Sequence, residues 1–126
     1  MQVLIDTSIW IDYFKSGIIS NDLSILIDEN LIVTNDIILT ELIPFLKVKG
    51  QKKIIQLLKD IVKFPLQIDW EEIIQFQVKC LNFGINGIGI PDLIIAQNSK
   101  QNNCKIYSLD NHFTVLKKII GIKIYK

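Results

Sequence analysis

The sequence of 126 residues contains no arginine, and all 14 of its basic residues are lysine. Binding of phosphate groups would therefore depend on ammonium groups, backbone N–H groups or a metal ion, because the two-pronged guanidinium contact is missing. The formal net charge is only +1. Overall charge thus indicates neither a nucleic-acid partner nor a membrane partner.

Cysteine is also scarce. Cys80 and Cys104 are the only two, and the sequence has neither a CxxC motif nor a cluster of histidine and cysteine that would hold zinc. We interpret both as buried, reduced thiols of a cytoplasmic protein.

Long uncharged apolar runs are missing as well. Every stretch of about 18 residues contains at least one charged residue, which argues against a transmembrane helix. Asp6 interrupts the N-terminal apolar run too early for a secretory signal peptide. Even so, 49% of the residues are hydrophobic and the mean hydropathy is +0.33. We expect residues 1–126 to form a single domain with a sheet covered on both faces and an oligomer interface.

Short apolar runs alternate with segments of helical periodicity. The predicted strands are residues 3–5, 31–33, 64–66, 105–107 and 122–124, and the predicted helices are residues 9–14, 21–30, 36–48, 51–60, 69–83, 91–102 and 112–119. Pro65 places its strand at a sheet edge, and Pro44 is expected to bend or end its helix. This order predicts an α/β fold, a three-layer α/β/α sandwich around a parallel sheet of four to five strands.

Four acidic residues have placements that suggest a common site. Asp6 and Asp110 follow two buried strands, and the carboxyl ends of parallel strands share one edge of a sheet. Asp92 lies in the first turn of a predicted helix, and Glu41 falls at helical spacing from Ile38 on the inward stripe of its helix. A buried glutamate needs a partner. We therefore expect these carboxylates to converge.

Each carboxylate also has a purely structural interpretation. Asp6 suits a helix N-cap, Asp92 complements a helix dipole, and Asp110 suits a turn or cap, whereas Glu41 could extend to solvent at the helix edge. Separate capping roles do not predict convergence. A converged set would repel itself unless a cation neutralised it, and hard divalent ions such as Mg²⁺ or Mn²⁺ take oxygen ligands.

Four segments, in this order, resemble the PIN-domain proteins, and among them the VapC toxins of prokaryotic toxin–antitoxin pairs. The segments are Val3–Asp12, Thr40–Leu42, Pro91–Ala96 and Ser108–Phe113, and the resemblance covers essentially the whole chain. Each segment alone is a weak signal. Their order and separation make the resemblance fairly specific.

The resemblance implies a metal-dependent endoribonuclease that hydrolyses RNA phosphodiester bonds with carboxylate-bound Mg²⁺, or Mn²⁺ in its place. The family's catalytic and metal-binding quartet maps onto Asp6, Glu41, Asp92 and Asp110. Secondary candidates are Ser108, where the family usually has a hydroxyl residue, and Thr7, which follows Asp6. The implied partners are RNA (tRNA or rRNA among the family's targets), a cognate antitoxin whose tail covers the acidic pocket, and a second copy in a homodimer.

Two other functions are weighed against this one. A catalytically weak PIN-fold module could bind RNA or a protein without turnover. A phosphoryl-transfer hydrolase or a receiver domain is ranked last, because the hydrolases need a second aspartate two residues after the first, where this chain has Ser8.

Several further residues have less specific signals. His112 is a lone histidine, for which a structural role is the usual one. Two clusters of lysine could neutralise phosphates, although lysines at helix ends more often serve solubility. The first cluster is Lys47, Lys49, Lys52 and Lys53, and the second is Lys117, Lys118, Lys123 and Lys126. The aromatic residues Trp10, Tyr13 and Phe14 fit a core or dimer interface better than base stacking.

Overall fold

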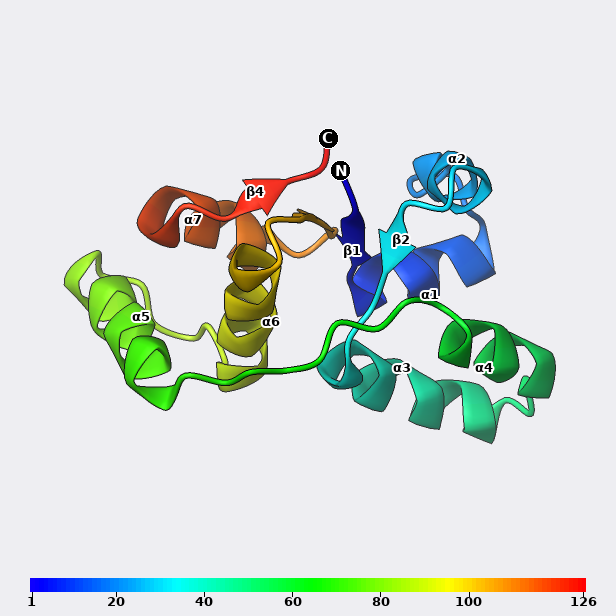
Figure 1. Ribbon diagram of the computed structural model, residues 1–126, viewed down its shortest axis with the longest axis horizontal. Helices are drawn as coiled ribbons and strands as arrows, with labels where there is room; N and C mark the ends of the chain where they lie inside the picture. The colour runs from blue at the N-terminus through cyan, green and yellow to red at the C-terminus, as the bar shows by residue number, and fades with distance from the viewer.

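The computed structural model describes residues 1–126, with a four-stranded sheet in the order β2-β1-β3-β4 at its centre (Figure 1). The strands are β1 (Val3–Ile5), β2 (Ile32–Val33), β3 (Lys105–Tyr107) and β4 (Lys123–Ile124), and all pairs are parallel. The interior strands β1 and β3 pair in register, with Ile5 opposite Tyr107. Their carboxyl ends therefore lie side by side at one edge of the sheet.

Two groups of helices cover the sheet. The helices are α1 (Thr7–Lys15), α2 (Asp22–Asp28), α3 (Asp36–Val48), α4 (Lys52–Lys59), α5 (Trp70–Asn82), α6 (Ile90–Gln101) and α7 (Asn111–Ile120). Helix α3 packs against α1 and α4, whereas α5, α6 and α7 pack against one another on the other side of the strands (Figure 1). The predicted three-layer α/β/α sandwich is confirmed.

The core forms where the central strands meet the helices. Leu4, Ile5 and Ile106 have no exposed surface, as their uninterrupted apolar strands predicted, and they belong to one continuous cluster of buried side chains. None of the helices combines the length and the apolarity that crossing a bilayer would need.

The predicted strand at residues 64–66 does not form. Pairing there is limited to a single parallel bridge between Thr34 and Lys63, in which the N–H of Phe64 donates to the carbonyl of Thr34 at 2.9 Å. No further backbone hydrogen bond joins the segment after Phe64 to β2, so the chain leaves the sheet. The sheet therefore has four strands.

Helix α3 departs from the prediction in two respects. Pro44 does not end it, since the helix continues to Val48. Glu41 is exposed and does not share the buried stripe, which consists of Ile38, Leu39, Leu42 and Leu46. The Glu41 carboxylate thus lies at the surface of the structure, where it is partly hydrated.

The two cysteines and the aromatic cluster lie as expected. Cys80 and Cys104 are buried free thiols, and burial raises the pKa of Cys104 to about 11. Trp10 is buried and stacks on Phe14 with ring centroids 5.7 Å apart. These rings belong to the packing between α1 and its neighbours.

Candidate functional site

Asp6 is fixed at the carboxyl end of β1 by both its backbone and its side chain. Its N–H donates to the carbonyl of Tyr107 at 3.0 Å, which extends the pairing of β1 with β3 by one residue. Its side chain caps α1 by accepting from the N–H of Ser8. With 7% of its surface exposed, Asp6 is the most buried acidic residue of the chain.

Two hydroxyl groups hold one oxygen of the Asp6 carboxylate. Ser8 Oγ and Ser108 Oγ both donate to Asp6 Oδ2, at 2.8 and 2.7 Å. Each hydroxyl in turn accepts a backbone N–H, from Leu109 at 3.0 Å and from Asp110 at 2.9 Å respectively. All side-chain hydrogen bonds of Asp6 thus end on Oδ2, which leaves Oδ1 available for another ligand.

Asp110 occupies the equivalent place after β3. It is the N-cap of α7, and its Oδ1 accepts from the N–H of His112 at 2.9 Å. Because Ser108 Oγ bonds both the Asp6 carboxylate and the Asp110 N–H, the ends of β1 and β3 are tied together by this one side chain.

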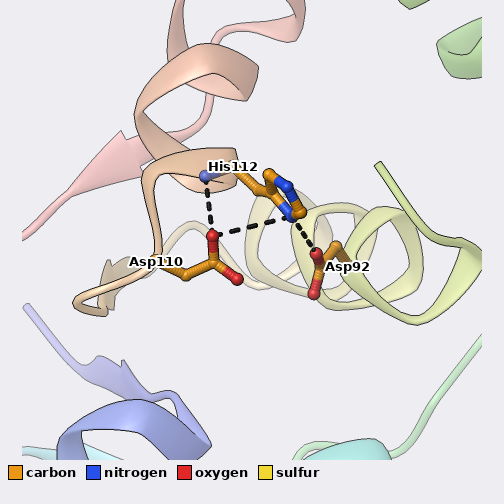
Figure 2. A group of neighbouring side chains, drawn as sticks. All are labelled: Asp92, Asp110 and His112. Carbon is orange, nitrogen blue, oxygen red and sulfur yellow. Dashed lines mark hydrogen bonds and ion pairs between the residues drawn. The ribbon is translucent and has the colours of Figure 1, made fainter. Parts of the chain in front are cut away.

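Asp92 reaches the same region from the first turn of α6, after Pro91. Its Oδ2 lies 2.8 Å from His112 Nδ1, and the same nitrogen lies 3.6 Å from Asp110 Oδ1. Figure 2 shows both carboxylates directed toward the imidazole ring. One ligand atom from each of these three residues lies within 4.8 Å of the other two.

Glu41 approaches from α3 across the sheet edge. Thr7 Oγ1 donates to Glu41 Oε1 at 3.3 Å, which links the first turn of α1 to the middle of α3. Partial burial raises the pKa of Glu41, and the negative charge of Asp6 raises it further, while the Thr7 hydrogen bond lowers it. The charges of Asp92 and Asp110 add to the same upward shift. The charges of the four predicted carboxylates therefore act on one another, but only Asp92 and Asp110, together with His112, have ligand atoms within 4.8 Å of one another.

The charge in this region is only partly compensated. The pKa of Asp92 is raised by burial, lowered by the His112 hydrogen bond, and raised again by Asp110. The pKa of His112 is raised in return, first by its hydrogen bond to Asp92. The N-termini of α1, α6 and α7 all open here, and their unpaired N–H groups favour negative charge.

Two residues of this site were undervalued by the sequence analysis. Ser8 was named only as the residue that stands where some hydrolases have a second aspartate, yet its hydroxyl binds Asp6. His112 was interpreted as structural, yet its ring lies between Asp92 and Asp110. Their spacing carried a signal in both cases, because each lies two residues after an aspartate that caps a helix.

The model of the PIN domain family matches residues 3–119. The chain belongs to the PIN domain family. The site described above lies within the matched range. No curated protein sequence matches this PIN domain.

Solved structures share the fold of this PIN domain over its whole length. VapBC2 from Rickettsia felis, bound to a DNA fragment from its promoter, has a TM-score of 0.77 at 20% identity, covering 99% of this chain and 98% of that one. VapBC-1 from nontypeable Haemophilus influenzae has a TM-score of 0.71 at 21% identity, covering 100% and 98%. VapC20 from Mycobacterium tuberculosis, a sarcin–ricin loop cleaving toxin, has a TM-score of 0.66 at 13% identity, covering 96% and 98%.

The donor set of this PIN domain fits a hard divalent cation. Carboxylate oxygens predominate, Asp6 Oδ1 is free of hydrogen bonds from the protein, and Asp92 and Asp110 lie close enough to share one ion. A cation would also relieve the mutual repulsion that raises the pKa values of Glu41 and Asp92. Mg²⁺ and Mn²⁺ both suit such a set.

Proposed function

We propose that this PIN domain is a metal-dependent endoribonuclease, the toxin of a toxin–antitoxin pair, formed as a single domain of residues 1–126. The observation that carries the proposal is the close approach of Asp92 and Asp110, with the charges of Asp6 and Glu41 near enough to act on theirs. The likeness in fold to VapC20, a sarcin–ricin loop cleaving toxin, supports an RNA substrate. A tRNA or another rRNA segment is an equally suitable target class.

We assign the metal-binding role to the same four carboxylates. A bound Mg²⁺ or Mn²⁺ would supply a Lewis acid that lowers the pKa of a water ligand and neutralises charge on the phosphoryl oxygens. Asp6 offers its free Oδ1 from a position fixed by Ser8 and Ser108. Asp92 and Asp110 offer oxygens from two different helices.

Glu41 has the best placement for handling the attacking water. Glu41 is exposed, so water can approach its carboxylate, and a carboxylate in this position can act as a proton acceptor. Hydrolysis would transfer a proton from the water to Glu41 as the new P–O bond forms, while the bond from phosphorus to the leaving ribose oxygen breaks and that oxygen takes up a proton from solvent. Thr7 would hold Glu41 in the orientation for this transfer.

Protein partners are assigned to the apolar surface. A cleft of about 330 Å³ is lined entirely by hydrophobic side chains from α1, α2, β2, α4 and the residues that follow α4, including Trp10 and Leu57. Leu57 is 67% exposed, and the Nε1 of the buried Trp10 has no hydrogen-bond partner. The similar VapBC structures are complexes. We propose a cytoplasmic protein whose apolar surfaces bind an antitoxin and a second copy.

The experiment that tests the proposal is RNA cleavage by purified, antitoxin-free protein. Total RNA is incubated with the protein in Mg²⁺, in Mn²⁺ and in EDTA, and the ends of any fragments are mapped. Asp92→Asn tests the site, and Asp28→Asn, a change at an exposed aspartate of α2, controls for loss of one charge.

The proposal predicts discrete fragments with metal for the parent protein and Asp28→Asn, and none with EDTA or for Asp92→Asn. Cleavage that is equal in the two variants would contradict the site. Intact RNA together with tight, metal-independent RNA binding would favour the binding module without turnover.

A further inference from the structure

His112 is the one side chain of the site that offers a nitrogen to the carboxylates. It is also the only histidine of the chain. Its Nδ1 lies 2.8 Å from Asp92 Oδ2 and 3.6 Å from Asp110 Oδ1, so the nitrogen is placed among the oxygens that would hold a metal ion (Figure 2).

These separations are those of neighbouring ligands around one ion. In an octahedral site with bonds of about 2.1 Å, adjacent ligand atoms lie about 3 Å apart and opposite ones about 4.2 Å apart. The two distances from Nδ1 fall within or just below this span, and the ligand atoms of all three residues lie within 4.8 Å of one another. Little rearrangement is needed for an ion to replace the present hydrogen bond.

The local structure also favours coordination through Nδ1. The N–H of His112 is bonded to Asp110 Oδ1, which fixes the backbone at the start of α7 and leaves Nδ1 on the side of the carboxylates. The side chain is 43% exposed, so the ring's other nitrogen can carry the proton and donate it to water. Nδ1 now donates its proton to the Asp92 carboxylate, so an ion bound at Nδ1 would displace that proton and leave the ring protonated only on its other nitrogen.

We infer that His112 Nδ1 is a direct ligand of the divalent ion, beside Asp92 and Asp110, and that it makes the site prefer Mn²⁺ to Mg²⁺. An imidazole nitrogen favours first-row transition metals, whereas Mg²⁺ favours oxygen ligands alone. The inference rests on the proposed metal-dependent function and specifies its metal site.

Pulsed electron paramagnetic resonance of the Mn²⁺-loaded, tag-free protein tests the inference directly. Because the chain has a single histidine, a ¹⁴N coupling of imidazole type on bound Mn²⁺ can come only from His112. Protein labelled with ¹⁵N-histidine should replace that coupling with a ¹⁵N doublet. Bound Mn²⁺ without a nitrogen coupling would overturn the inference, since a histidine that only orients Asp92 would not be a ligand.

A substitution provides a second measurement. His112→Asn should lower the affinity for Mn²⁺ by at least about tenfold, while the affinity for Mg²⁺ falls by less, so that the ratio of the two affinities shifts toward Mg²⁺. Asn111→Ala, at the exposed neighbouring position, should change neither affinity. Equal losses for both ions, or no loss, would contradict the inference.

Failure of this inference and failure of the proposed function give different results. RNA cleavage with bound Mn²⁺ that lacks the nitrogen coupling would remove only the role of His112. A nitrogen coupling without RNA cleavage would support the ligand and contradict the nuclease. A parent protein that binds no Mn²⁺ would contradict both.

Discussion

Ser108 joins the two central strand ends, and its replacement by alanine is the sharpest test of how the site is built. Ser108 Oγ donates to Asp6 Oδ2 at 2.7 Å and accepts from the Asp110 N–H at 2.9 Å. Ser108→Ala removes both contacts without adding volume. Ser8 Oγ remains bonded to Asp6 Oδ2 at 2.8 Å, so the carboxylate keeps one of its two hydroxyl donors.

The size of the effect follows from the charge of the acceptor. A hydrogen bond to a charged group contributes about 1.5–3 kcal/mol to the free energy of unfolding, and Asp6 is 7% exposed, so water replaces little of the loss. The entropy of unfolding is about 2.1 cal/mol/K per residue, which for 126 residues converts this range to a fall in Tm of roughly 6–11 °C.

Thermal unfolding followed by circular dichroism measures this change, and titration with Mn²⁺ measures its effect on the site. We expect Ser108→Ala also to weaken Mn²⁺ binding by about tenfold, as is usual when a group that orients a metal ligand is removed. Ser108→Thr keeps the hydroxyl and should recover the binding. Ser24→Ala, which removes an exposed hydroxyl bonded to Tyr13, is the matched control. A Ser108→Ala protein with unchanged Tm and unchanged Mn²⁺ affinity would refute this account of Asp6.

Three further predictions concern pH, Thr7 and assembly. The folded-state pKa values of Glu41, Asp92 and His112 are all raised, so metal-free protein should gain stability as the pH falls through those raised values toward the ordinary ones of 6.5 for histidine, 4.5 for glutamate and 3.8 for aspartate; Glu41→Gln should reduce the part of this gain that lies toward pH 4.5 in a thermal unfolding series. Thr7→Val should raise the pKa of Glu41 further and move the acidic limb of the cleavage pH profile upward with little change in Tm, and an unmoved limb would contradict the role of the Thr7 hydrogen bond. Light scattering on antitoxin-free protein should give twice the chain mass of 14.5 kDa, and a monomer at all concentrations would exclude the homodimer.

The fold was largely predictable because its signals are local. The uninterrupted apolar run of Val3–Ile5 and the caps Asp6, Asp69 and Asp110 each determine a strand or a helix start by neighbouring contacts alone. The strand at residues 64–66 was wrong because apolar composition alone favours an edge strand there, whereas the chain pairs with the sheet only through the single bridge at Lys63.

The site was predictable only in part, because its geometry depends on contacts distant in sequence. Chain order placed Asp6 and Asp110 at one sheet edge, but the hydroxyl bridge from Ser108 spans 102 residues. Periodicity placed Glu41 on a buried stripe, whereas the orientation of α3 against α1 leaves Glu41 exposed and hydrogen-bonded to Thr7. The contact of His112 with Asp92 depends on the approach of α6 to α7, which the spacing of His112 from Asp110 does not encode.

The central claim is that the four carboxylates bind the metal ion that supports RNA cleavage. The most direct test measures the cleavage rate of one mapped RNA and the occupancy of bound Mn²⁺ in the same samples across a Mn²⁺ titration. The account predicts that the two curves rise together and that Asp92→Asn shifts both to higher Mn²⁺ concentration. Cleavage that is already complete before Mn²⁺ binds, or that persists undiminished in Asp92→Asn, would contradict it.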